Sequence, residues 1–155
     1  MSDSRQVLLI VYHSQSGTCA RMARAAAEAA GEGGEVEVRV RRACDAAVTD
    51  LAAAGGLLLV AAENAGYLAG GMKEFIDRVF YPAIDRELLL PYALLVSAGN
   101  DGRNAVAQAQ RLLRGIPLTQ ATEPVICRGE WCEAHAQRAG ELGEAFATGL
   151  SMGVF

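Results

Sequence analysis

The stretch Val7–Cys19, VLLIVYHSQSGTC, decides the fold, because in it a continuous apolar run passes directly into a short polar loop. Such an uninterrupted apolar run is typical of a parallel strand that is covered on both faces. Beyond the loop, Arg21, Arg24 and Glu28 recur three and four residues apart among alanines. This spacing predicts a helix over about 18–30, and hence one strand–loop–helix unit of an α/β protein.

Four more strands are predicted along the chain. Glu35–Arg41 alternates valine with charged residues, which is typical of a half-exposed strand at a sheet edge. Leu57–Ala62 and Tyr92–Val96 are continuous apolar runs and are expected to be buried. Thr122–Cys127 contains Pro124, which cannot donate to a ladder, so this strand is expected at the other edge.

Helical spacing separates the later strands. Apolar residues from Met72 to Phe80 follow a helical period that Pro82 is expected to close, and helices are also predicted over 105–113 and 131–150. The alternation predicts the class α/β, a doubly wound five-stranded parallel sheet in the order 2-1-3-4-5, formed by one domain over 1–155. Ligands of such sheets bind beyond the carboxyl ends of strands one and three.

Composition and charge exclude several classes of function. Hydrophobic residues make up 52% and charged residues 21% of the 155, as in globular proteins. A net charge of −4 argues against a nucleic-acid-binding face. Val7–Tyr12 is too short for a signal-peptide core or a membrane span, so no membrane insertion is expected. The four cysteines lack the spacing of a zinc site or a redox pair, so we expect no metal and reduced thiols in the cytoplasm.

The loop after the first strand has the composition of a phosphate site. A phosphate there would meet unpaired N–H groups and the positive end of a helix dipole. Ser14, Ser16 and Thr18 add hydroxyl donors, and Gly17 permits close approach of the backbone. The alternative is plain helix capping, for which one hydroxyl is sufficient. The loop carries no Lys or Arg, so dipoles and neutral donors would hold the anion.

Other motifs with a loop at this place do not match. The chain has neither the Gly-x-Gly-x-x-Gly of dinucleotide sites nor the Gly-Lys-Ser/Thr of nucleoside triphosphate sites. A serine nucleophile elbow needs glycine two residues before the serine, where this chain has Tyr12. Low-molecular-weight tyrosine phosphatases begin their loop with a cysteine and place an arginine after five residues. Here Cys19 closes the loop and Arg24 follows too early.

Two further loops are predicted at the same sheet edge. Glu63–Gly71 follows the third strand and offers an amide, three glycines and Tyr67, whose ring could cover one face of a flat ring system. Ser97–Gly102 follows the fourth strand and is rich in small residues, which permit close approach to a ligand. Each could be an ordinary turn, and the three together indicate a ligand site.

These motifs resemble the flavodoxin-like FMN proteins over nearly the whole chain, from Val7 to about Leu150. HSQSGT resembles their phosphate loop, Thr/Ser-x-Thr-Gly-x-Thr. ENAGYLAGGMKEFIDRVFYP resembles the segment that flavodoxin-family oxidoreductases carry after strand three. Cys19 stands where the phosphate motif has threonine. Ala62 and Ala65 replace the usual proline and aromatic residue, so the ring is expected to be less enclosed.

The resemblance implies FMN as cofactor, with the flavin supplying the electron chemistry and no catalytic side chain. It implies two functions: an NAD(P)H-dependent oxidoreductase that reduces a quinone or similar small acceptor, or a one-electron carrier that docks on redox proteins. The mild charge and aromatic-poor loops favour the oxidoreductase, which is often oligomeric in this group. The phosphate would lie against Ser14, Gln15, Ser16, Gly17, Thr18 and Cys19, and the ring between Glu63, Asn64, Ala65, Gly66 and Tyr67 on one side and Ser97, Ala98, Gly99, Asn100, Asp101 and Gly102 on the other.

Overall fold

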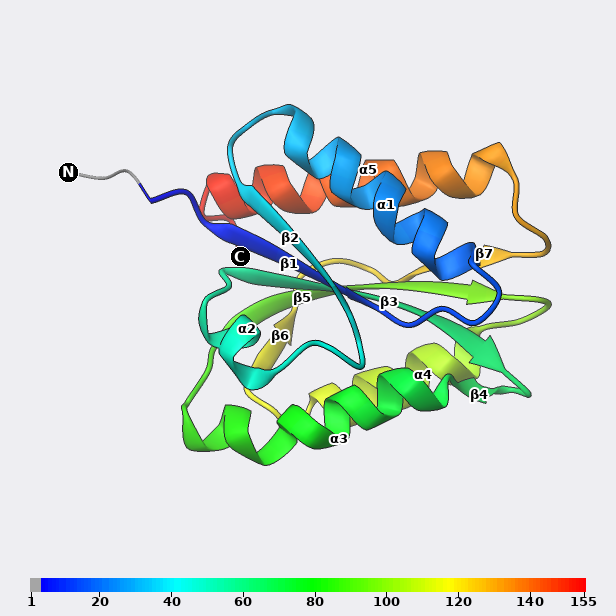
Figure 1. The fold of residues 1–155 in the computed structure, drawn as a ribbon, viewed down its shortest axis with the longest axis horizontal. Coiled ribbons are helices and arrows are strands. Elements are labelled where there is room, and N and C mark those ends of the chain that lie inside the picture. The colour runs from blue at the N-terminus through cyan, green and yellow to red at the C-terminus, as the bar shows by residue number, and fades with distance from the viewer. Residues whose placement is uncertain (1–3) are drawn as a thin grey trace.

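The computed structural model describes residues 4–155, in which helices cover both faces of a central sheet. Figure 1 shows α1 and α5 on one face, and α3 and α4 on the other. The elements in chain order are β1 (Val7–Tyr12), α1 (Thr18–Glu32), β2 (Glu37–Arg42), α2 (Val48–Ala52), β3 (Gly56–Asn64), β4 (Tyr67–Leu68), α3 (Gly70–Asp85), β5 (Leu90–Ala98), α4 (Arg103–Leu113), β6 (Leu118–Gln120), β7 (Val125–Arg128) and α5 (Glu133–Ser151).

The sheet has the predicted doubly wound topology. Its order is β2-β1-β3-β5-β6, and β7 also pairs with β5, so β6 and β7 share the fifth position. All these pairings are parallel, whereas the short β4 pairs antiparallel with the end of β3. The order 2-1-3-4-5 is therefore confirmed. The loops after β1, β3 and β5 lie at one edge of the sheet because parallel strands end on the same side.

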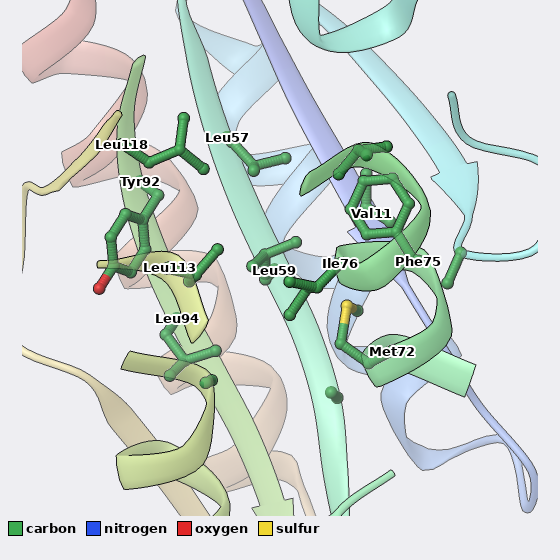
Figure 2. Packing of buried hydrophobic residues seen from close by; sticks show 14 of the residues in the cluster. Val11, Leu57, Leu59, Met72, Phe75, Ile76, Tyr92, Leu94, Leu113 and Leu118 are labelled. Atoms are coloured by element: carbon green, nitrogen blue, oxygen red, sulfur yellow. The ribbon is translucent and has the colours of Figure 1, made fainter. Parts of the chain in front are cut away.

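Burial on both faces explains the apolar run in β1. Leu9 and Val11 belong to the cluster beneath α3 and α4, whereas Leu8 and Ile10 belong to the cluster beneath α1 and α5. All four side chains are fully buried. Figure 2 shows the first cluster, in which the side chains of α3 pack onto β1 and β3. The edge strand β2 is largely exposed, as its alternating charges predicted.

The structure departs from the predicted elements at the last strand, at the end of α3 and at α2. The strand predicted over Thr122–Cys127 is shorter and is complemented by β6, because Pro124 has no N–H and the ladder resumes only at Val125. Helix α3 continues past Pro82 to Asp85, since a proline in the last turn removes only one intrahelical bond. The short helix α2 was not predicted, because it buries only Leu51 and has no sustained apolar period.

Small residues bring α1 and α5 together over the sheet. A Cβ on Gly143 would lie 2.3 Å from the carbonyl oxygen of Ala26, so this glycine permits the close contact of the two helices. Phe146 is fully buried beside it. The packing fixes the axis of α1 and thereby the position of its first turn. Within residues 4–155, no helix is long and apolar enough to cross a bilayer.

Candidate functional site

The first loop forms a tight turn between β1 and α1. The backbone N–H of His13 donates to the carbonyl of Val60 at 3.1 Å, so the turn leaves the sheet only after this residue. Gly17 is the N-cap of α1 and has φ of 101°, a conformation that L side chains rarely adopt. Its N–H donates to the hydroxyl oxygen of Ser14 at 3.0 Å. Ser14 thus shapes the turn as an acceptor and keeps its own proton for a ligand.

The first turn of α1 offers backbone donors. Its first intrahelical bond runs from the N–H of Arg21 to the carbonyl of Gly17 at 3.0 Å, so the N–H groups of Thr18, Cys19 and Ala20 have no partner within the helix. The N-cap residue, Gly17, has no side chain that could accept a hydrogen bond from these N–H groups, and no acidic residue lies in the first turn. The dipole of this 15-residue helix adds a positive potential. These donors fit a phosphate group.

A pocket of about 220 Å³ lies on this helix start and extends toward β3 and β5. It is lined by His13, Ser14, Gln15, Ser16, Thr18, Cys19, Ala62, Asn64 and Ser97. The structure therefore brings the predicted phosphate loop together with Asn64 and Ser97 of the other two loops. The amide of Asn64 donates to the side-chain oxygen of Gln15 at 3.1 Å and so connects the first loop to the second.

Two lining residues, His13 and Ala62, were not among the predicted site residues. Ala62 pairs with Ser97 in the ladder between β3 and β5, so the strand register places both at the pocket. His13 packs against α3, where a Cβ on Gly71 would lie 2.2 Å from its Nδ1. The position of His13 directly after the first strand was the signal in the sequence that could have identified it as a lining residue.

Cys19 is buried beneath the loop, with only 2% of its surface exposed. Burial raises the pKa of its thiol to about 12, against a smaller opposite effect of a hydrogen bond with the backbone of Ser97. The side chain therefore stays protonated and contributes packing, while its N–H is one of the helix-start donors without a partner in the helix. This environment disfavours the thiolate form that a reactive cysteine needs.

The second loop is a β-hairpin between β3 and β4. Asn64 pairs with Tyr67, and the two residues between them, Ala65 and Gly66, have φ of 50° and 84°. Positive φ at both positions defines a type I′ turn, in which alanine is strained by about 1–2 kcal/mol. Helix α4 holds the hairpin, because Asn104 donates to the carbonyl of Gly66. This contact joins the tip of the hairpin to the start of α4.

Tyr67 does not line the pocket at the start of α1. Its side chain is 62% exposed and lines a separate groove of about 390 Å³ together with Leu68, Gly70, Lys73, Gln108, Arg111 and Leu112. That groove lies between the hairpin and helices α3 and α4. That this ring covers a flat ligand stays a prediction, and in this structure the ring lies in a groove other than the pocket at the start of α1.

The third loop contributes one residue, Ser97, to the pocket at the start of α1. Ala98 is buried and packs against Gly102, where a Cβ would lie 3.0 Å from the Cβ of Ala98. The carboxylate of Asp101 pairs with Arg103 at 2.7 Å, which lowers the pKa of Asp101. Gly99 and Asn100 are exposed at the tip of the loop.

Glu63 also lies outside the pocket, because its carboxylate turns toward α4. One oxygen accepts from the N–H of Gly102 at 3.1 Å and the other from the N–H of Ala105 at 3.3 Å. Glu63 thus caps the start of α4. Among residues 4–155, no cluster of His, Cys, Asp and Glu has the arrangement of a metal site.

Comparison with known proteins agrees with this architecture. The family model described as "Flavodoxin" matches residues 10–111. A flavodoxin from the domain Archaea superposes with a TM-score of 0.81 at 20% identity, over 94% of this chain and 99% of that chain. The WrbA-like flavodoxin of Agrobacterium tumefaciens gives 0.79 at 18% identity, over 95% and 98%. Rubredoxin oxygen:oxidoreductase of Desulfovibrio gigas gives 0.80 at 14% identity, over 97% of this chain and 38% of that one. No curated protein matches in sequence.

Proposed function

The chain belongs to the flavodoxin family, which implies FMN as its cofactor. From that premise we propose that FMN places its phosphate at the start of α1 and that the protein is an NAD(P)H-dependent oxidoreductase that reduces a quinone or a similar small acceptor. The bound flavin would supply the electron chemistry, and the protein would position it and shape access to it.

The observation that carries the cofactor site is the uncapped start of α1. The free N–H groups of Thr18, Cys19 and Ala20 can donate to phosphate oxygens, with hydroxyl donors from Ser14 and Ser16 beside them. A charged acceptor strengthens each of these hydrogen bonds. FMN should therefore bind far more tightly than riboflavin, which has the same ring and no phosphate.

The proposed ring site lies between the hairpin 64–67 and the loop 97–102, next to the phosphate pocket. Ala65, Gly66 and Gly99 are exposed and small, so they leave room for a nicotinamide and then an acceptor above the ring. Ala98 and Ala69 do not add to this room, because both are buried. The small exposed rim, together with the net charge of −4, supports a reductase over a protein-docking carrier.

Anaerobic mixing of the FMN-loaded protein with NADH or NADPH tests the oxidoreductase proposal. We expect at least one nicotinamide to bleach the flavin absorbance, and benzoquinone or free flavin to restore it. If neither nicotinamide bleaches the flavin, while a separate reductase protein reduces it rapidly, the chain is an electron carrier. Titration of the flavin-free protein with FMN and with riboflavin tests the phosphate site independently of any turnover.

A further inference from the structure

The helix starts of α1 and α4 lie at the same edge of the sheet but differ in their partners. Glu63 accepts from the N–H groups of Gly102 and Ala105, at 3.1 and 3.3 Å. The carboxylate of Asp101 accepts from the N–H of Arg103 at 3.2 Å. The first intrahelical bond of α4 runs from Val106 to Gly102, so these carboxylates satisfy most of the donors in its first turn.

The charge of Glu63 is directed at the helix start alone. Asp101 forms an ion pair with Arg103 at 2.7 Å, so an adjacent cation balances its charge. Among the ion pairs of residues 4–155, none includes Glu63. Its half-buried carboxylate therefore neutralises the positive end of the α4 dipole. Helix α1, with no acid in its first turn, keeps that potential for a ligand.

The same carboxylate connects the two loops that flank the proposed ring site. Glu63 is at the end of β3, where it pairs with Leu68 of β4, and it bonds to Gly102 at the end of the third loop. The N–H of Leu68 donates to the side chain of Gln108 at 2.7 Å, and Asn104 donates to Gly66. The hairpin and the first two turns of α4 thus form one hydrogen-bonded unit.

We propose that Glu63 is a positioning residue whose carboxylate occupies the start of α4 as an internal anion. It leaves α1 as the helix start that takes the cofactor phosphate, and it fixes the hairpin to the third loop on either side of the ring. This inference rests on the proposed function, because it takes the start of α1 as the phosphate site. A cap that contributed only stability would leave both phosphate placement and ring affinity unchanged.

The test compares Glu63→Ala and Glu63→Gln with Glu144→Ala, which removes one carboxylate from an exposed position on α5. Glutamine keeps an acceptor oxygen and loses the charge, so it separates the hydrogen bond from the electrostatic effect. Titration with inorganic phosphate is followed by the amide chemical shifts of the starts of α1 and α4. Affinities for FMN and riboflavin are measured by quenching of flavin fluorescence.

In the wild type and in Glu144→Ala, phosphate should shift the amides of 18–20 and leave those of 102–105 unchanged. In Glu63→Ala, phosphate should also shift the amides of 102–105. Its affinities for FMN and riboflavin should both fall about tenfold or more, since two hydrogen bonds to a charged group are lost. Glu63→Gln should regain part of the riboflavin affinity and still admit phosphate at α4.

The proposal is overturned if both Glu63 variants match Glu144→Ala in riboflavin affinity and in the α4 shifts. If Glu63→Ala does not fold, the Glu63→Gln variant alone decides, through the appearance or absence of the α4 shifts. Failure of the proposed phosphate site looks different: wild-type protein would then bind FMN no more tightly than riboflavin, and phosphate would leave the amides of 18–20 unchanged.

Discussion

Replacing Gly17 with valine should separate the conformational role of this glycine from its role in binding. Gly17 has φ of 101°, and a Cβ at this position meets no protein atom within 4 Å. The added Cβ therefore meets no steric conflict inside the protein, but the backbone of the variant is strained by about 1–2 kcal/mol. The added methyl groups lie at the helix start, where the phosphate must approach the N–H groups. FMN affinity should fall at least about tenfold, or 1.4 kcal/mol.

Gly34→Val is the matched control for this variant. Gly34 also has positive φ, at 65°, and open space around it, but it lies in the turn beyond the far end of α1. Urea unfolding should show a loss of about 1–2 kcal/mol for both variants. Fluorescence titration should show weaker FMN binding for Gly17→Val alone, with little change in riboflavin affinity. Equal FMN affinity in the two variants would refute the phosphate assignment and leave helix capping as the role of the loop.

Three further changes test the site and the packing that holds it. Ser16→Ala should weaken FMN by roughly 1.5–3 kcal/mol without affecting riboflavin, because a donor to a charged group is lost; isothermal titration measures both. Since burial raises the pKa of Cys19 from 9.0 to about 12, the unfolded chain releases this proton first as the pH rises above 9. Urea titrations at pH 9 to 11 measure this effect. The free energy of unfolding of the wild type should fall with pH more steeply than that of Cys19→Ala, by about 1.4 kcal/mol per pH unit. Cys44 is exposed, so the control variant Cys44→Ala should behave as the wild type. Gly143→Ala places a methyl group against the backbone of Ala26, so it should lower the free energy of unfolding by about 1–3 kcal/mol; a denaturation midpoint equal to the wild type would show that the two helices can separate freely.

The sequence predicted the parts of the fold that depend on burial. The continuous apolar run of Val7–Tyr12 and the alternating charges of Glu35–Arg41 correctly placed a central and an edge strand, because solvent exposure determines which residues each face can carry. The uncapped helix start after β1 could also be predicted from the sequence, because its N–H donors come from a helix that immediately follows a strand. Both features are local in the chain.

Features that depend on contacts between distant segments were not predicted. The loop composition suggested that Tyr67 could cover a ring, and the family resemblance implied that Glu63 would flank it. Yet the hairpin turns Tyr67 toward α3 and α4, and Glu63 toward the N–H groups of α4, whose first turn begins about forty residues later in the chain. To predict the directions of these two side chains, one must know the register between the strands and the position of a second helix. The split of the last strand around Pro124 likewise depends on which segment of β5 each half meets.

A site built mainly from backbone groups explains why little sequence is needed to specify it. The donors at α1 are N–H groups that every residue except proline supplies, so Cys19 can stand where the family has threonine without loss of a backbone donor. What the site does require is a residue that adopts positive φ at position 17, an uncapped first turn, and a helix axis held by packing against α5. These requirements constrain few side chains. The fold can thus persist at the 14 to 20% identity that separates this chain from the solved structures named above.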